Sequence, residues 1–77
     1  MKIVFTGACE EFTRAELEKL LEDSGITLQK QVSGKTDILV LANKNSGTRK
    51  AQKARKLGIP IMLYKDFFME YIPEYFI

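Results

Sequence analysis

The run Ile38-Leu39-Val40-Leu41-Ala42 decides the fold, because it is the longest uninterrupted apolar stretch in this chain of 77 residues. A strand that is apolar on both faces is typical of the centre of a parallel sheet whose two faces are covered by helices. Residues 37–42 are therefore predicted to form a central strand. The run is too short to cross a membrane as a helix, which requires about 20 apolar residues.

Shorter segments on both sides of this strand predict the rest of the sheet. Residues 2–6 form an apolar run that ends in Thr6-Gly7, and residues 26–32 alternate weakly between apolar and polar side chains. Residues 59–63 give a further strand, in which Pro60 favours an edge position or a strand start. The sequence therefore predicts a small sheet of four strands, with residues 37–42 at its middle and residues 2–6 as a further buried strand.

Two of the three predicted helices have clear boundary or core signals. Thr13 and Glu16 fit a capping box that begins the first helix, and Gly25 ends this helix near Ser24. The last helix is predicted over residues 66–71. Its expected core side chains are Phe67, Phe68 and Tyr71.

The helix between them carries the strongest charge signal in the chain. Ser46 or Thr48 can cap it, Gly58 ends it, and its narrow apolar stripe consists of Ala51, Ala54 and Leu57. Residues 44–56 contain six cations and no acid, although the whole chain carries only +2 at pH 7: Lys44, Arg49, Lys50, Lys53, Arg55 and Lys56. Such a segment is either a solvated helix face or a surface for phosphate-bearing partners.

These elements follow one another in the order βαββαβα. No linker, repeat or change of composition interrupts them, so residues 1–77 are expected to form a single domain. Strands that alternate with helices indicate the α/β class, with a parallel sheet and helices on both of its faces.

The composition excludes several kinds of active site. The chain has no histidine, which removes histidine acid–base catalysis, Ser–His and Cys–His pairs and the common zinc sites. The single cysteine, Cys9, cannot form an internal disulfide, which favours a reducing, intracellular compartment, and it is expected to be an incidental loop thiol. We therefore expect a binding module that is not itself an enzyme, with no metal, no cofactor and no small-molecule substrate.

Four stretches, in this order and at this spacing, resemble the BRCT domain family over about residues 3–72. They are Val4-Phe5-Thr6-Gly7, Thr13-Arg14-Ala15-Glu16-Leu17, the segment 32–40 and the segment 46–61. The resemblance is to the branch found in NAD-dependent DNA ligases and in the large subunit of replication factor C. It implies four parallel strands in the order 2-1-3-4, flanked by three helices. Phe67 stands where many BRCT domains have a tryptophan, as is usual in the ligase-like branch.

A phosphate pocket is predicted where the first strand ends. Ligands of open parallel sheets gather at the carboxyl ends of the strands. There, Thr6 offers a hydroxyl, Gly7 a backbone N–H, Arg14 a guanidinium and Lys50 an ammonium group. The sequence is not that of a P-loop, because Gly7 is not followed by Gly-Lys-Ser or Gly-Lys-Thr.

The resemblance adds a ligand to this pocket. The replication factor C type of BRCT domain is similar in using Thr, Gly, Arg and Lys for the 5′-phosphate of a DNA end, and these fall on Thr6, Gly7, Arg14 and Lys50. Further contacts with the duplex backbone are expected from four other cations: Arg49, Lys53, Lys56 and, as an additional phosphate contact, Lys35.

Each of these residues also has a purely structural interpretation. Thr6 and Gly7 could only shape the turn after the strand, and Lys50 could be a solvated helix residue. Arg14 could form surface ion pairs with nearby acids, namely Glu10, Glu11 and Glu18. Paired carboxylates such as Glu10-Glu11 and Glu22-Asp23 are expected to be solvated charges.

Two functions follow from the sequence. The first is a DNA-binding module of a replication or repair protein that recognises the 5′-phosphate of an end or nick. The second is a protein-interaction module that binds a phosphopeptide or a replication or repair partner, for which the aromatic tail, residues 72–77, would be partly exposed. Any catalytic domain, such as that of a ligase, would lie outside these residues.

Overall fold

A computed structural model describes residues 1–8, 11–45 and 48–76 of the chain. Four parallel strands form one sheet in the order β2-β1-β3-β4, as predicted. The strands are β1 (Lys2–Thr6), β2 (Thr27–Gln29), β3 (Ile38–Leu41) and β4 (Ile61–Leu63). The helices are α1 (Arg14–Asp23), α2 (Thr48–Leu57) and α3 (Tyr64–Tyr71), followed by the 3₁₀ helix η1 (Pro73–Phe76).

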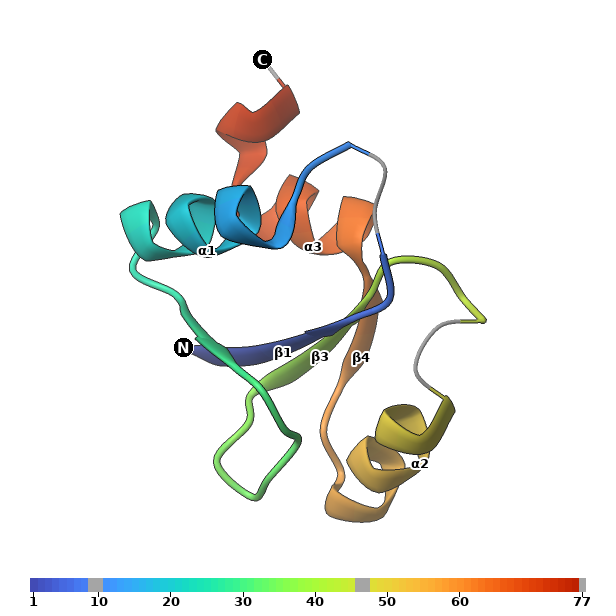
Figure 1. The fold of residues 1–77 in the computed structure, drawn as a ribbon. Helices are drawn as coiled ribbons and strands as arrows, with labels where there is room; N and C mark the ends of the chain where they lie inside the picture. The colour runs from blue at the N-terminus through green and yellow to red at the C-terminus, as the bar shows by residue number, and fades with distance from the viewer. Residues whose placement is uncertain (9–10, 46–47, 77) are drawn as a thin grey trace.

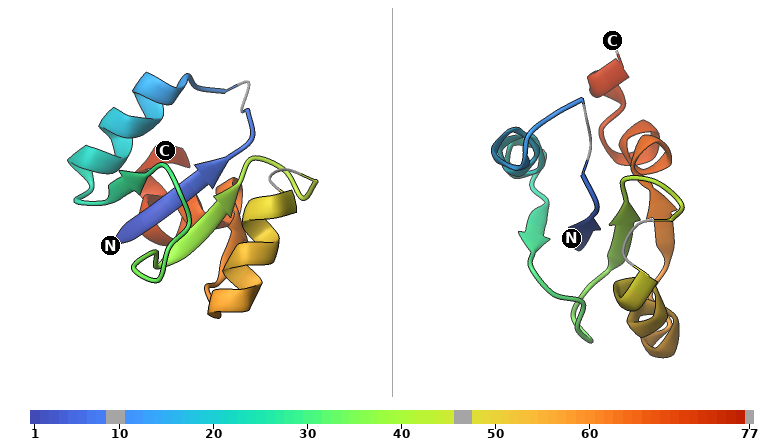
Figure 2. Two further views of the ribbon diagram at one scale, coloured as in Figure 1. Left: turned by 60° about the horizontal axis from the view of Figure 1, so that its bottom comes forward. Right: turned by 45° about the vertical axis from the view of Figure 1, so that its right-hand side comes forward.

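The helices lie in two layers on opposite faces of the sheet. Figures 1 and 2 show α1 and α3 on one face and α2 on the other. The central strands alternate accordingly: Ile3 and Phe5 of β1 pack toward α1 and α3, whereas Val4 packs toward α2. The α/β class and the coverage of both faces are confirmed.

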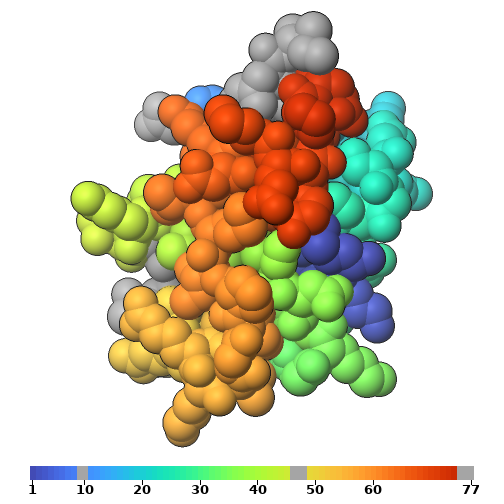
Figure 3. Space-filling view, turned by 180° about the vertical axis from the view of Figure 1, so that it is seen from behind, coloured from blue at the N-terminus to red at the C-terminus, as the bar shows by residue number. Residues whose placement is uncertain are grey.

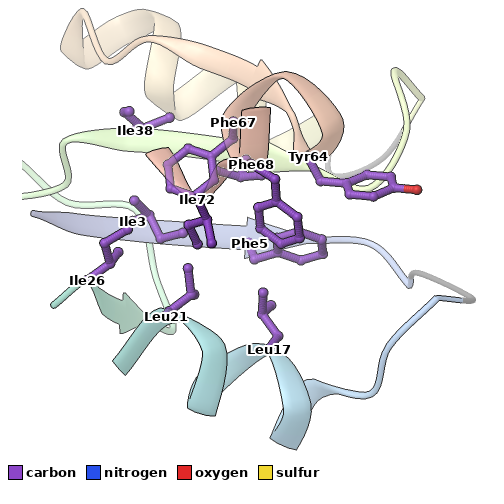
Figure 4. Close-up of a cluster of buried hydrophobic side chains, with 11 residues drawn as sticks. Ile3, Phe5, Leu17, Leu21, Ile26, Ile38, Tyr64, Phe67, Phe68 and Ile72 are labelled. Atoms are coloured by element: carbon purple, nitrogen blue, oxygen red, sulfur yellow. The ribbon is translucent and has the colours of Figure 1, made fainter. Parts of the chain in front are cut away.

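The larger core lies between the sheet and the pair α1–α3. Figure 4 shows side chains from β1, α1 and α3 meeting there, with Phe67 and Phe68 at the centre, and both rings are fully buried. The prediction that Tyr71 belongs to this core is wrong, because 40% of its surface is exposed. Tyr71 instead lies at the rim, with its ring centroid 5.0 Å from that of Phe67.

The smaller core lies under α2. Ala51 and Ala54 are buried there against Val4, Leu39 and other side chains of the sheet. Leu57, predicted to complete the apolar stripe, is 47% exposed. Two alanines allow the helix to approach the sheet closely, and the stripe of buried side chains on α2 ends at Ala54.

Several predicted boundaries were too wide or misplaced. β2 covers only residues 27–29 of the predicted 26–32, because it is an edge strand that pairs with β1 alone. After it, Thr36 Oγ1 donates to Gln29 Oε1 over 2.8 Å and closes a turn. α3 starts at Tyr64, two residues earlier than predicted, directly after β4. Of the two predicted caps of α2, Ser46 lies outside the described residues and Thr48 is the first helical residue.

The C-terminal segment is partly buried and partly exposed, in agreement with the prediction of a partly exposed tail. Ile72 is completely buried in the core of the α1–α3 layer, and residues 73–76 form η1. Pro73 and Glu74 are exposed, and residue 77 lies outside the described part. Among the described residues, no helix is long and apolar enough to cross a membrane.

Candidate nucleic-acid interface

The site begins at the carboxyl end of β1. The carbonyl of Thr6 is the last backbone acceptor in the β1–β3 ladder, and it accepts a hydrogen bond of 2.9 Å from the amide of Ala42. Gly7 follows with a φ of +96°, a backbone conformation that side-chain-bearing residues rarely adopt. The chain therefore leaves the sheet abruptly at Gly7, and this residue has no side chain to block an approaching ligand.

A capping box determines where Arg14 lies. Thr13 Oγ1 accepts the Glu16 amide at 3.2 Å, and Glu16 Oε1 accepts the Thr13 amide at 2.9 Å, as the sequence predicted. Arg14 is the first residue of α1, and its side chain is exposed. At that position the partial positive charge of the helix N-terminus adds to the charge of the guanidinium, so both favour an anion.

Gly7 and Arg14 line one surface pocket. Its other walls come from Ala8, Thr13 and the apolar side chains Phe5, Phe12 and Leu17. Among the described residues that line it, there is no carboxylate. The structure thus brings together two of the four residues predicted to bind phosphate, in a pocket with one cation and an apolar floor.

The predicted ion pairs of Arg14 are not found within the described part of the chain. Glu11 accepts a hydrogen bond from the Tyr64 hydroxyl at 3.0 Å. Glu10 lies outside the described residues, and no interaction of Arg14 with Glu18 is observed. Within the residues that the structure describes, no carboxylate therefore pairs with the Arg14 guanidinium.

Thr6 approaches the same edge from the other face of the sheet. It pairs with Leu41, whose side chain belongs to the core under α2, and side chains of paired residues in a parallel ladder point to the same face. Thr6 is only 9% exposed. It is therefore separated from the Gly7–Arg14 pocket by the strand itself, although the two lie at consecutive positions.

Lys50 also lies on the α2 face of the sheet. Its side chain is half-buried, and Nζ donates to the carbonyl oxygen of Lys30 over 3.5 Å. Lys30 follows Gln29, which pairs with Val4, so this ammonium lies near the carboxyl ends of β1 and β2. The four predicted residues hence straddle one edge of the sheet, Gly7 and Arg14 from one face and Thr6 and Lys50 from the other.

The predicted backbone contacts form a continuous basic face on α2. Arg49 and Lys53 line two neighbouring pockets, one shared with Lys50 and Gln31 and the other with Lys56. No ion pair with a described carboxylate involves these cations. Cations that form no intramolecular ion pair can neutralise phosphates without first breaking such a pair.

Lys35 lies apart from the pocket. It belongs to the turn that joins β2 to β3, where its amide donates to Ser33 Oγ at 3.3 Å. Two residues later the Asp37 amide donates to the carbonyl of Lys2, which is at the opposite, amino edge of the sheet. Figure 1 shows this turn on the same side of the sheet as α2, so Lys35 can extend the basic face but not the pocket.

Three features around the candidate site were not predicted from the sequence. Phe12 could have been found, because an apolar residue just before an N-cap often packs on the residue four positions into the helix, here Leu17. Gln31 carried no signal, since its place beside Lys50 depends on how α2 packs on the sheet. Tyr64 and Glu11 are 53 residues apart, and nothing local to either predicts their hydrogen bond.

Comparisons with known proteins agree with this architecture. The BRCA1 C Terminus (BRCT) domain family matches residues 1–68. The DNA ligase of Latilactobacillus sakei subsp. sakei (strain 23K) is 47% identical over 64 residues, which are 83% of this chain and 9% of the relative. For the DNA ligase of Anaplasma phagocytophilum (strain HZ) the identity is 50% over 60 residues, or 78% of this chain and 9% of the relative.

A third relative, the DNA ligase of Oleidesulfovibrio alaskensis, covers 90% of the chain at 36% identity and 10% of its own length. The chain thus spans about a tenth of the length of the curated relatives that it matches. The strand order, the capping box and these matches agree, and the chain belongs to the BRCT domain family.

Proposed function

We propose that this domain is a non-catalytic DNA-binding module of a replication or repair protein, and that it recognises the 5′-phosphate of a DNA end or nick. The observation that carries the proposal is the pocket lined by Gly7 and Arg14 at the carboxyl edge of the sheet. The three relatives described above are DNA ligases, proteins whose name refers to DNA. We infer that the domain contributes binding, and that the catalysis of such a protein is performed elsewhere.

Recognition of the terminal phosphate would use both faces of this edge. The backbone N–H of Gly7 and the guanidinium of Arg14 would contact the phosphate from the α1 side. The ammonium of Lys50 would swing from the Lys30 carbonyl to reach it from the α2 side, and Thr6 would add its hydroxyl. A terminal phosphate monoester carries more charge than a phosphodiester, so this set of donors favours an end over the interior of a strand.

The duplex would lie along the basic face of α2. Arg49, Lys53 and Lys56 would contact backbone phosphates, with Lys35 as a further contact on the same side of the sheet. Such contacts release counterions and carry no base information. The proposal therefore predicts steep salt dependence, no sequence preference and a gain from the 5′-phosphate.

Fluorescence anisotropy with a labelled duplex that has a recessed 5′ end tests this function. The wild type should bind the 5′-phosphorylated duplex about tenfold more tightly than the unphosphorylated one, which corresponds to about 1.4 kcal/mol. Thr6→Val and Lys50→Gln should remove most of this gain, whereas Lys65→Gln, an equal change of charge on α3, should preserve it. Equal affinity of the wild type for both duplexes would overturn the proposal of 5′-phosphate recognition.

The exposed surface of α3 favours protein interaction as a second function. Met69 is 65% exposed, and Tyr71 lines a pocket with Pro60, Met62 and other residues of the amino edge. Figure 3 shows the end of α3, the start of the chain and the segment before β3 side by side on this face. Loss of a partner from co-purification after Met69→Lys, with DNA binding unchanged, would support it. If the domain binds DNA and no protein partner is found whose binding depends on Met69, protein interaction as a second function would be contradicted.

A further inference from the structure

The segment between β1 and α1 is described at residues 7–8 and 11–13, and its Ala8, Phe12 and Thr13 line the pocket of Gly7 and Arg14. A local contact, the capping box, joins Thr13 to Glu16. The position of Arg14 relative to Gly7 depends on how α1 packs on the sheet and on the contacts that residues 11–13 make with the rest of the domain.

A contact from α3 holds the residue at position 11. Tyr64 is the first residue of α3, and its hydroxyl donates to Glu11 Oε1 over 3.0 Å. The ring of Tyr64 is 9% exposed, and Figure 4 shows its hydroxyl pointing away from the buried cluster. A hydrogen bond between a hydroxyl and a carboxylate is among the stronger kinds in proteins, so it can hold Glu11 against α3.

The adjacent side chain is held by the same helix. The ring of Phe12 lies with its centroid 5.9 Å from that of Tyr64 and 5.6 Å from that of Phe68. It also lies 5.8 Å from the ring of Phe5, in β1. Phe5 and Phe12 both line the Gly7–Arg14 pocket, so these ring contacts connect α3 directly with the floor of the pocket.

We propose that Tyr64 is a positioning residue for the phosphate pocket. Its hydroxyl holds Glu11 and its ring supports Phe12, and together they hold residues 11–13, directly before Arg14, against α3. The expected effect on DNA binding rests on the proposed function. The restraint that Tyr64 places on residues 11–13 does not, because it exists in the free domain. α3 thus determines the shape of a site to which it contributes no ligand.

Tyr64→Phe tests the hydroxyl without removing the ring. In the free domain, hydrogen exchange of the Thr13 amide, which donates to Glu16 Oε1, should become about threefold faster or more, because residues 11–13 are less restrained without the Tyr64 hydroxyl. The preference for a 5′-phosphorylated over an unphosphorylated recessed duplex should fall by a similar factor. Tyr71→Phe is the matched control, because it removes a hydroxyl from the exposed end of the same helix and should change neither quantity.

A double-mutant cycle ties the effect to Glu11. Glu11→Ala should change the same quantities as Tyr64→Phe, and the double variant should lose less than the sum of the two single variants, because both changes remove the same hydrogen bond. Glu11→Gln keeps an acceptor and should preserve most of the exchange protection. Circular dichroism spectra like that of the wild type establish that each variant is folded.

The outcomes separate this inference from the proposed function. Equal affinity of the wild type for both duplexes would reject 5′-phosphate recognition, and the hydrogen-exchange comparison would still decide the role of Tyr64. Unchanged exchange of the Thr13 amide in Tyr64→Phe would overturn the inference, whatever the result with DNA. Additive effects in the double-mutant cycle would also overturn it, because the two residues would then act independently.

Discussion

Arg14 occupies the first position of α1, next to a pocket that among the described residues holds no carboxylate. If its guanidinium contacts the terminal phosphate, Arg14→Gln should lower the preference for a 5′-phosphorylated duplex about tenfold, as expected when a charge-assisted hydrogen bond is removed. Lys19→Gln is the matched control, because it removes the same charge from an exposed position on the same helix. Anisotropy titrations of the two variants measure the difference, and an equal loss in both would show that only net charge matters.

Phe68 is the residue on which the stability of the larger core depends most clearly. Its ring is fully buried and contacts rings from α3 and from the β1–α1 segment. Phe68→Ala should lower the free energy of unfolding by about 3–5 kcal/mol, a large share of the stability of a small domain. Met69→Ala, its exposed neighbour, should change it by less than about 0.5 kcal/mol. Urea unfolding followed by circular dichroism measures both, and a loss below about 1 kcal/mol for Phe68→Ala would contradict the described core.

The start of α1 depends on the capping box. Thr13→Ala removes the acceptor for the Glu16 amide and should lower the free energy of unfolding by about 1 kcal/mol. Glu16→Gln keeps an acceptor for the Thr13 amide and should cost less. Urea unfolding followed by circular dichroism measures both effects. If Thr13→Ala is as stable as the wild type or more stable, the cap is not formed in solution.

The outer face of α2 should act as one electrostatic unit. Replacing Lys53 and Lys56 by Gln should weaken binding to phosphorylated and unphosphorylated duplexes alike. The slope of log affinity against log salt concentration should become shallower by roughly 0.9 for each phosphate that the variant no longer neutralises. Lys19→Gln with Lys65→Gln removes two charges from α1 and α3 and should change the slope less. Equal slopes for the two double variants would exclude α2 as the specific contact surface.

The elements show what the sequence could and could not predict. Local signals placed α1 correctly, because Thr13, Glu16 and Gly25 act on their immediate neighbours. β2 was predicted too long, since its end depends on a turn closed by Thr36 and on having a single neighbouring strand. α3 was predicted too short, because Tyr64 follows β4 without an intervening loop and without a side-chain cap.

The candidate site was predictable to a similar degree. Gly7 and Arg14 were expected at one place and line one pocket, because each is fixed by nearby residues. The face on which Thr6 lies follows from strand alternation and could have been inferred from the sequence. The contacts of Lys50 and Tyr64 could not, because they depend on how α2 and α3 pack against segments far away in the chain.

At the scale of the whole molecule, charge is separated across the sheet. α2 contains five cations and no acid, whereas α1, on the opposite face, has four acids against two cations. A field of this kind orients an approaching polyanion toward α2 before any specific contact forms. The carboxyl edge lies between the two charged layers, so a duplex held on α2 would present its end to the Gly7–Arg14 pocket.

Proton–nitrogen correlation spectra of the labelled domain test the central claim most directly. The domain is titrated with the same recessed duplex, with and without its 5′-phosphate. We predict that the amides of α2 shift with both duplexes, whereas the Gly7 and Arg14 amides shift strongly only with the phosphorylated one. Shifts confined to α2, and identical for the two duplexes, would contradict recognition of the 5′-phosphate and leave a domain that binds the DNA backbone without distinguishing its ends.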